Sequence, residues 1–419
     1  TAMRRVFIAG GALTTFIGKG HPDFVHEKHK DFGKRSNPTL EQYITSAVDL
    51  AAANTKLDLK LVDQVAVGNF CGELFSSQGH LGAVATAHKD LQYKPSMRVE
   101  GACASGALAF QIAVNSIRAG GNVALAVGAE VQSTVSSRQG GDFLARASHY
   151  ARQRSMDDFV FPCIFARRMK HIAASKHFTM EDTARVAVKA YANGAKNPLA
   201  HMHKAKPMTF EHCNTAGEKN PNFLKNEEYK QFLRVTDCSQ VTDGGAAVVV
   251  ASEEGLKAMG RDLKDCIEIT GLACACGSLL EDPANYLEMD TSKAAAAKAL
   301  GQAGVKPSDL QVAEVHDCFT IAEILMYEAL GIAAFGEGAK LIREGQTNLD
   351  GRIPVNTGGG LLSFGHPVGA TGIKQVLEVY RQMKGQCGDY QLRVIPQLGA
   401  ALNMGGDDKT AVCTVMRNL

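Results

Sequence analysis

The chain has 419 residues, 45 % of them apolar, which is enough for two or three packed units with substantial cores. Its 45 lysines and arginines nearly balance its 43 aspartates and glutamates, and a net charge of +2 argues against a nucleic-acid partner, which requires a basic face. No apolar run approaches the roughly 18 residues that a transmembrane helix needs, so we expect no membrane span.

Short β-branched runs alternate with amphipathic helical patterns along most of the chain, which predicts βαβ units in an α/β fold. The predicted strands are residues 5–9, 64–67, 123–128 and 246–251 in the first half, and residues 267–270, 311–315, 394–396 and 409–415 in the second. A helix is expected to begin after Thr39, because Thr39 and Gln42 form a capping-box pair behind Pro38.

Residues 133–234 differ in character, with many basic residues and methionines and few strand patterns. One helix is predicted at residues 182–195, and the stretch is typical of an inserted subdomain of helices and loops. Basic residues such as Arg167 and Arg168 are candidates to contact phosphates, with a solvated surface as the alternative for each.

The 11 cysteines form an odd and irregular set without a CxxC pair, which indicates free thiols in a reducing compartment. Cys274 and Cys276 are too close together for a familiar zinc knuckle, so no metal site is predicted.

An internal repeat relates the two halves of the chain. The segment Cys103-Ala-Ser-Gly-Ala aligns with His366-Pro-Val-Gly-Ala, and each segment opens an amphipathic helix after a turn of small residues. A duplicated α/β unit would place these two helix starts opposite each other across a pseudo-twofold axis. Each half would then deliver one reactive side chain at a helix N-terminus.

Cys103 is the candidate nucleophile. A helix N-terminus lowers the pKa of a thiol, and Gly101 and Gly106 permit a tight turn that leaves the backbone N–H of Cys103 free to stabilise an oxyanion. The alternative is a buried structural cysteine.

His366 is the candidate base. It lies in residues 357–372, where six glycines indicate a backbone of tight turns and close contacts. An imidazole in this setting can take the thiol proton and then donate a hydrogen bond to a developing negative charge. A histidine that caps a loop is the alternative.

Two further motifs lie beside apolar strands. Residues 314–319, Glu-Val-His-Asp-Cys-Phe, place Cys318 at the C-terminal edge of a strand, where α/β sheets usually build their sites, and its thiol is a candidate acid or base. Residues 402–406, Leu-Asn-Met-Gly-Gly, precede the last strand, and their glycines are able to aim a backbone N–H into the same pocket. A cysteine that ends a buried strand and an ordinary turn are the respective alternatives.

Together these motifs resemble the thiolase superfamily over essentially the whole chain. Cys103-Ala-Ser resembles its nucleophile motif, and Gly-His366-Pro, with the Gly-Ala-Thr-Gly that follows, resembles its histidine motif. Asp243-Gly-Gly-Ala-Ala is similar to the stretch that closes the first half.

Two departures from the common pattern resemble the sterol carrier protein type of thiolase. His316-Asp-Cys318-Phe stands where most thiolases have Asn-Glu-Ala-Phe, and Asn403-Met-Gly405 stands where most have a Cys-x-Gly motif with a second catalytic cysteine. The resemblance implies that Cys318 has taken over the acid/base duty. No sterol-carrier domain is expected after residue 419.

The resemblance also implies the remaining catalytic roles. Cys103 would attack the 3-keto carbonyl with the help of His366, and the backbone N–H groups of Cys103 and Gly405 would hold the oxyanion. His366 and His316 would stabilise the enolate of acetyl-CoA. Asn403 occupies a motif position to which no role is assigned.

The implied fold is the five-layered αβαβα thiolase fold, built from two duplicated halves with an inserted loop subdomain. The first half covers residues 1–132 and 236–262, the insertion residues 133–235, and the second half residues 263–419. Coenzyme A and acyl-CoA are implied as substrates, with Ser239, Arg167 and Arg168 as contacts and with no metal or other cofactor. A homodimer in a mitochondrial or peroxisomal (glycosome-like) matrix is implied, and not a secreted protein.

The expected reaction is the cleavage of a 3-ketoacyl-CoA by CoA to acyl-CoA and acetyl-CoA, or the reverse Claisen condensation. Two other functions stay open. A 3-ketoacyl synthase shares the fold and uses a cysteine with two histidines, but it has no evident use for Cys318. A non-catalytic thiolase-like protein that binds acyl-CoA would explain why the late motif lacks its cysteine.

Overall fold

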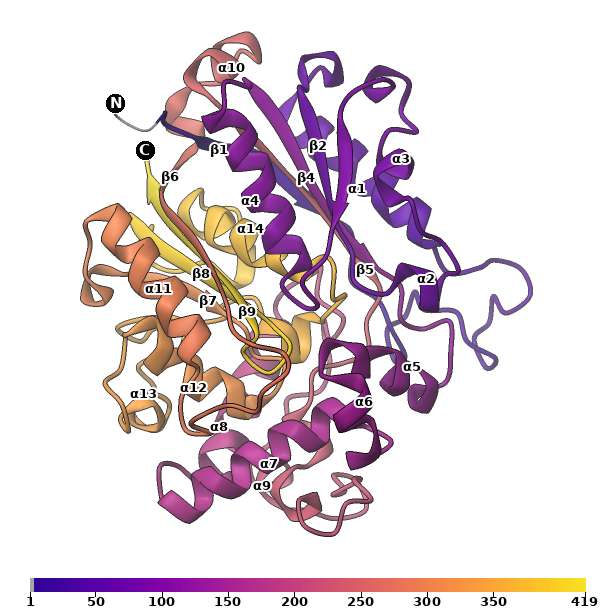
Figure 1. Ribbon diagram of the computed structural model, residues 1–419, viewed down its shortest axis with the longest axis vertical. Coiled ribbons are helices and arrows are strands. Elements are labelled where there is room, and N and C mark those ends of the chain that lie inside the picture. Colours follow the sequence, from indigo (N-terminus) through magenta and orange to yellow (C-terminus); the bar gives the residue numbers. More distant parts are fainter. Residues whose placement is uncertain (1–3) are drawn as a thin grey trace.

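The computed structural model describes residues 4–419 and shows one continuous sheet (Figure 1). Its strand order is β3-β2-β4-β5-β1-β6-β9-β8-β7, and the pairing of β1 with β6 joins the sheet of the first half to that of the second. The strands are β1 (Phe7–Leu13), β2 (Gln64–Gly68), β3 (Ser96–Val99), β4 (Val123–Glu130), β5 (Gly244–Ala251), β6 (Ile267–Cys276), β7 (Val312–Val315), β8 (Leu398–Gly405) and β9 (Thr410–Asn418).

The α-helices vary widely in length. They are α1 (Leu40–Thr55), α2 (Gly72–Phe75), α3 (Leu81–Ala85), α4 (Ser105–Arg118), α5 (Ser137–Leu144), α6 (Tyr150–Gln153), α7 (Val160–Ser175), α8 (Met180–Gly194), α9 (Phe210–Asn214), α10 (Glu253–Ala258), α11 (Asp290–Ala303), α12 (Thr320–Leu330), α13 (Gly338–Arg343) and α14 (Thr371–Met383). Within residues 4–419, every helix is too short or too polar to serve as a membrane span.

The two halves of the sheet repeat one pattern. In the first half, β2 is parallel to β3 and β4, and β5 runs antiparallel between β4 and β1. In the second half, β7 is parallel to β8, and β9 runs antiparallel between β8 and β6. The parallel neighbours are joined by helical crossovers, as parallel strands require. The duplication that the sequence predicts is therefore present in the topology.

Helices cover both outer faces of the sheet and also separate its two halves (Figure 1). α1 and α3 pack on the outer face of the first half, and α11 and α12 pack on that of the second. α4 and α14 contact each other in the layer between the half-sheets. The five-layered αβαβα arrangement is therefore confirmed.

The central layer has an apolar core with a few paired polar groups inside it. Phe110 of α4 and Ile373 of α14 are fully buried there. α14 is enclosed on almost every side, and its polar residues find partners within the protein: Lys374 bonds to Glu314, and Gln382 bonds to Thr357. This enclosure holds the start of α14 in a fixed place beside α4.

Most of the predicted elements are confirmed, with one error and one addition. The capping box of Thr39 and Gln42 begins α1. Residues 394–396 do not form a strand, because Pro396 has no N–H to donate to a ladder and Val394 faces solvent; β8 begins at Leu398. β3 is an additional strand, whose sequence Ser-Met-Arg-Val lacks the apolar run of its neighbours.

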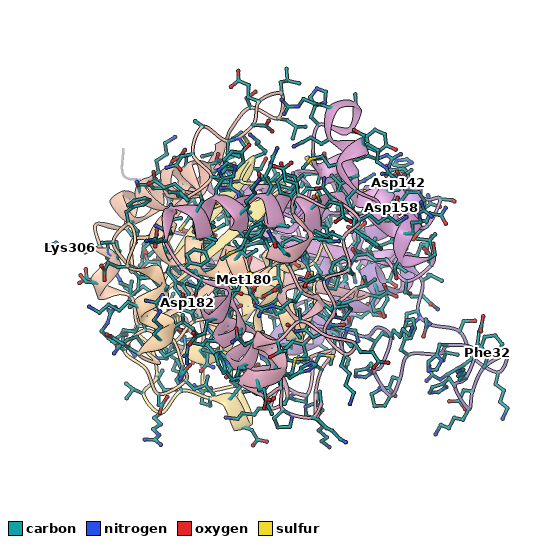
Figure 2. The ribbon with its side chains drawn as sticks, turned by 90° about the horizontal axis from the view of Figure 1, so that it is seen from below. Phe32, Asp142, Asp158, Met180, Asp182 and Lys306 are labelled. Carbon is teal, nitrogen blue, oxygen red and sulfur yellow. The ribbon has the colours of Figure 1, made fainter. Side chains whose placement is uncertain are left out.

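Between β4 and β5 the described chain forms only helices, turns and loops. α8 begins at Met180 behind a second capping box, which includes Asp182 (Figure 2). The carboxylate of Asp182 also accepts two hydrogen bonds of 2.6 Å from the guanidinium of Arg343 in α13, which attaches this segment to the second half. A helical insertion is therefore present, while the limits given for the domains stay a prediction.

Candidate active site

A cavity of about 1070 Å³, measured out to its mouth, is lined by residues of both halves and of the inserted segment. Most of its lining is apolar and much of it is aromatic; the aromatic residues are Phe70, Phe75, Phe159, Phe161 and Phe319. The thiols and the imidazole in the lining are those of Cys103, Cys238, Cys318 and His366. An apolar cavity with a few convergent polar groups is the usual form of a small-molecule site.

Three of the predicted site residues converge closely. The sulfur of Cys103 and one ring nitrogen each of His316 and His366 all lie within 4.8 Å of one another. The three side chains come from the turn before α4, the end of β7 and the loop before α14. The two halves therefore deliver their reactive groups to one point, as the repeated helix starts predict.

Glycines allow the two helix starts to come this close. A Cβ on Gly106 would lie 2.6 Å from the carbonyl oxygen of Gly369, and a Cβ on Gly372 would lie 2.2 Å from the backbone nitrogen of Ala107. Both distances are far below van der Waals contact, so any larger residue would push the two loops apart. The glycines of the two motifs thus serve close backbone approach.

Burial dominates the electrostatics of Cys103. It raises the pKa of the thiol to about 12, although the backbone N–H groups of Gly406 and of Cys103 itself favour the thiolate. α4 begins at Ser105, two residues after Cys103, and the expected lowering of the pKa of Cys103 is wrong because burial dominates. At rest Cys103 is a thiol, and it needs a base.

His366 is arranged as that base. Its Nδ1 is 2.5 Å from Oγ1 of Thr371, whose hydroxyl donates to the carbonyl of Pro367 at 3.2 Å. With that hydroxyl proton engaged, Nδ1 carries the hydrogen and donates to Thr371, and Nε2 keeps its lone pair. Nε2 is buried without a partner. Burial, followed by the charge of Lys374, lowers the pKa of His366 to about 3, so the ring is neutral.

His316 lies edge-on to His366, with 5.2 Å between the ring centroids. Its side chain is almost completely buried, and Nδ1 is 2.9 Å from Nδ2 of Asn403. Burial, and then the neighbouring His366 and Lys374, lower the pKa of His316 well below its usual value. The two rings are therefore both neutral.

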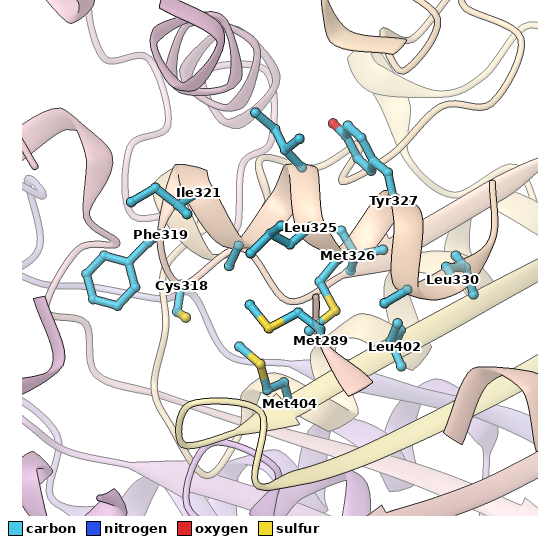
Figure 3. Packing of buried hydrophobic residues seen from close by; sticks show 14 of the residues in the cluster. Met289, Cys318, Phe319, Ile321, Leu325, Met326, Tyr327, Leu330, Leu402 and Met404 are labelled. Carbon is cyan, nitrogen blue, oxygen red and sulfur yellow. The ribbon is translucent and has the colours of Figure 1, made fainter. Parts of the chain in front are cut away.

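Cys318 lies two residues before the start of α12. Residues of α12 share one apolar cluster with Met404 of β8 (Figure 3). Burial raises the pKa of the Cys318 thiol well above its usual value, and the nearby sulfur of Cys103 raises it further. The carbonyl of Cys318 accepts a hydrogen bond of 3.0 Å from the N–H of Ser239. Ser239 thereby lies in the cavity wall, as does Cys318.

The backbone N–H of Gly406, one residue beyond the predicted Gly405, favours the thiolate of Cys103. Gly405 packs against the backbone of the turn before α4, since a Cβ at this position would lie 2.1 Å from the carbonyl oxygen of Gly101. Gly406 also lines the cavity. The role of the Gly405 N–H stays a prediction, and the N–H of Gly406 is a second candidate partner of the Cys103 N–H.

Arg167 and Arg168, the predicted contacts of a CoA phosphate, both have partners within the protein, and their contact with CoA stays a prediction. Arg168 is 1 % exposed, and its guanidinium donates to Asp407 at 2.5 Å and to the carbonyls of Tyr286 and Glu288. Arg167 contacts Asp282 at 3.3 Å and lies over the ring of Tyr286. Neither residue lines the cavity, and both contact the loop of residues 282–288.

Glu130 is a structural support of the site that sequence reasoning missed. Its buried carboxylate accepts hydrogen bonds from the backbone N–H groups of Phe70 at 2.9 Å, Cys71 at 3.0 Å and Gly369 at 3.0 Å. It therefore ties a loop of the first half to the loop that carries His366. The available signal was an acidic residue at the end of an otherwise apolar strand.

Gln132 is a second support that the motifs do not contain. Its side-chain amide donates to the carbonyls of His366 at 2.8 Å and Thr242 at 2.9 Å. Its own N–H donates to Asp243 at 2.7 Å. Gln132 thereby links Asp243 and Thr242 to the backbone of His366.

Comparison with known proteins gives two matches to family models. The model "Thiolase, N-terminal domain" matches residues 28–254, and "Thiolase C-terminal domain-like" matches residues 278–418.

Curated relatives match over almost the whole chain. The acetyl-CoA acetyltransferase of Methanothermobacter thermautotrophicus is 32 % identical, over 91 % of this chain and 95 % of its own. The benzoylsuccinyl-CoA thiolase subunit BbsB of Thauera aromatica is 30 % identical, over 96 % and 95 %. Human sterol carrier protein 2 is 28 % identical, over 93 % of this chain and 68 % of its own.

Solved structures share the fold. Human mitochondrial 3-ketoacyl-CoA thiolase superposes with a TM-score of 0.70 and 16 % identity over 99 % of both chains. The Ltp2–ChsH2 aldolase superposes with a TM-score of 0.76 and 22 % identity, over 99 % of this chain and 98 % of that one.

Proposed function

Since the chain belongs to the thiolase family and is an acyltransferase like its relatives, we propose that it cleaves a 3-ketoacyl-CoA with CoA, or runs the reverse condensation. The products of cleavage are an acyl-CoA and acetyl-CoA. The observation that carries the proposal is the convergence of Cys103, His316 and His366 within 4.8 Å of one another, at a cavity that Cys103, His366 and Cys318 line. Cleavage of this carbon–carbon bond needs a nucleophile, a proton carrier and two sites for negative charge.

The first step is attack by Cys103 on the 3-keto carbonyl. The proton of the thiol passes to Nε2 of His366, which has a free lone pair and no other partner. The sulfur bonds to the carbonyl carbon, and the electron pair of the carbonyl moves to its oxygen. The N–H groups of Cys103 and Gly406, which favour negative charge on the sulfur, hold that oxyanion.

The tetrahedral adduct then breaks its bond between C2 and C3. The acyl group stays on Cys103, and the electron pair leaves with the acetyl-CoA unit as an enolate, which His316 and the protonated His366 stabilise. Cys318 gives its proton to C2, which completes acetyl-CoA. A thiol whose pKa is raised holds its proton until a strong base such as the enolate is present.

The second half of the reaction returns every group to its starting state. The Cys318 thiolate takes the proton of an incoming CoA thiol, and the CoA sulfur attacks the acyl-Cys103 carbonyl. The Cys103 thiolate leaves and recovers its proton from His366. CoA supplies the second nucleophile, so the chemistry calls for no metal or redox cofactor, and Ser239 in the cavity wall is the proposed pantetheine contact.

We also propose a homodimer, located in a mitochondrial or peroxisomal matrix. β3 lies at one end of the sheet and leaves one edge of its backbone without a partner strand among the described residues. Met97 of this strand is 41 % exposed. Unpaired backbone N–H and C=O groups at a sheet edge are suited to pairing with a strand of a second copy. A loop near the N-terminus also projects from the first half, with Phe32 at its tip (Figure 2).

Thiolysis of acetoacetyl-CoA and of longer 3-ketoacyl-CoA substrates by free CoA tests the proposed reaction. Cys103→Ala should abolish the acyl-enzyme that mass spectrometry detects. Cys318→Ala should still acylate, but net turnover should fall by more than about 100-fold. Cys238→Ala is the matched control, because this third thiol also lines the cavity and has no part in the mechanism; its turnover should stay within about threefold. Absence of turnover with every substrate would favour a protein that only binds acyl-CoA.

A further inference from the structure

The two neutral histidines of the site differ in the hydrogen-bond partner of their Nδ1 atom. Nδ1 of His366 faces the hydroxyl oxygen of Thr371, which accepts. Nδ1 of His316 faces Nδ2 of Asn403 at 2.9 Å, and an amide nitrogen can only donate. In a neutral imidazole one nitrogen carries the hydrogen and the other accepts, so the partner of one nitrogen decides the state of the other.

We propose that Asn403 is a positioning residue that holds His316 in the tautomer with its hydrogen on Nε2, so that His316 presents an N–H donor to the reacting thioester oxygen. The inference rests on the proposed thiolysis reaction and assigns a role to the residue that stands in place of the second cysteine of most thiolases. The same logic gives His366 the opposite tautomer. One ring is then a proton acceptor and the other a donor, 5.2 Å apart.

Burial makes this assignment consequential. The side chains of His316 and Asn403 are each 1 % exposed, so water cannot substitute for the partner of Nδ1. Asp317, the next residue along the chain, does not bond to the ring either: its Oδ1 accepts from the N–H of Leu361, and its Oδ2 is buried without a partner. Among residues 4–419, Asn403 is the only hydrogen-bond partner of the His316 ring. A donor that is fixed before the reaction stabilises an oxyanion without reorganisation.

The groups that face His316 are few. His366 and Cys103 lie on the cavity side. Lys374 approaches from α14, and its charge is paired with Glu314 at 2.9 Å. None of these supplies a second acceptor or donor for Nδ1, so a change at position 403 should be felt mainly through the ring of His316.

Asn403→Asp tests the proposal, because a carboxylate is close in shape and can only accept. It should move the hydrogen of His316 to Nδ1 and leave Nε2 without one. Loss of one oxyanion donor lowers kcat by about 10²–10³, and KM should change by less than about threefold, because the donor acts on the enolate and not on bound CoA. Deuterium exchange at C2 of acetyl-CoA, which requires the enolate, should fall by the same factor.

The pH profile separates this effect from structural damage. The new carboxylate favours the imidazolium form of His316, which carries N–H groups on both nitrogens. The loss of kcat in Asn403→Asp relative to wild type should therefore become smaller as the pH falls from about 8 to about 6. A loss that is equal at both pH values would overturn the proposal.

A second background provides the matched control. His316→Asn keeps an amide donor in place of the imidazole, and in this background Asn403→Asp should change kcat by less than about threefold at every pH, since no tautomer remains to be set. An equally large loss in both backgrounds would show that Asn403 acts through packing, and the proposal would fail.

A readout without turnover keeps the inference distinct from the proposed function. Long-range ¹⁵N NMR of histidine-labelled protein reports the tautomer of each ring, and the resonances of His316 are identified by their absence in His316→Asn. We expect the Nε2–H form in wild type and the Nδ1–H form in Asn403→Asp. The Nδ1–H form in wild type would refute the inference, whatever substrate the enzyme accepts. Failure of wild type to cleave any ketoacyl-CoA would refute only the proposed reaction.

Discussion

Lys374 and Glu314 form a buried ion pair that supports the site. Removing the charge of Lys374 should lower the free energy of unfolding by an amount that depends on pH. The Nζ and Oε2 atoms of the pair are 2.9 Å apart, and the two side chains are 0 % and 1 % exposed. Burial raises the pKa of Glu314, and the positive charge of Lys374 opposes that rise. Lys374→Met keeps a flexible apolar chain of similar length and removes only the charge.

The expected loss of stability depends on the state of Glu314. Breaking a buried pair by removing one partner costs about 3–5 kcal/mol where the other charge remains ionised. In the variant Glu314 reduces this cost by keeping its proton, so its pKa in the folded state rises further above that of an unfolded glutamate. A raised folded-state pKa gives stability at low pH that is lost as the pH rises. The deficit relative to wild type should thus grow with pH, by up to about 1.4 kcal/mol per unit.

Urea unfolding of wild type and Lys374→Met at about pH 6.5, 7.5 and 8.5 measures this deficit directly. The double variant with Glu314→Gln is the control, because an amide does not titrate and the stability of this variant should lack the pH slope of the single variant. A single-variant deficit that stays flat with pH, or that remains below about 1 kcal/mol as for a surface pair, would refute the reasoning.

Two further substitutions probe the surroundings of the catalytic groups. Thr371→Val removes the acceptor of His366 Nδ1 within the same volume, so the rate of Cys103 acylation in rapid-quench mass spectrometry should fall by about 10- to 100-fold; an unchanged rate would mean that packing alone orients the ring. Burial lowers the pKa of His201 to about 4. As the pH falls from about 7 to about 5, the unfolded chain takes up a proton at this residue that the folded chain does not, which should lower the free energy of unfolding by about 2 kcal/mol. His201→Gln should remove that part of the acid sensitivity in urea unfolding, and equal pH slopes for the two proteins would contradict it.

The sequence predicts the fold and the reactive residues well because both depend on local patterns. The alternation of strand and helix periods identifies the two α/β halves, and the glycines around Cys103 and His366 indicate loops that must approach something closely. The prediction for residues 394–396 failed because an apolar run resembles a strand wherever it lies, and only the tertiary structure shows that Val394 faces solvent. Local patterns contain no information about such long-range placement.

Charged residues were the least predictable part of the site. Arg167 and Arg168 looked like surface cations, yet Arg168 is buried against Asp407, which lies far away in the sequence. Lys374 and Glu314 were unnoticed for the same reason, since each has the appearance of an ordinary polar residue until α14 is enclosed between the half-sheets. A partner that is distant in sequence decides whether a charge is solvated, paired or catalytic, and a single sequence does not show that partner.

Duplication alone does not explain the chemistry of this site. Two equivalent halves bring two helix starts together, and His316 after β7 lies beside them. Thiolysis, however, requires unequal groups: an acceptor for the thiol proton and a donor for the enolate oxygen. The inequality originates in residues that the repeat does not share. Thr371 follows His366 within the same motif and accepts from it, whereas Asn403 reaches His316 from the neighbouring strand β8 and donates to it. Two imidazoles with similar burial and the same neutral state thereby become a base and a hydrogen-bond donor, which explains how one residue type can supply both functions in a symmetric fold.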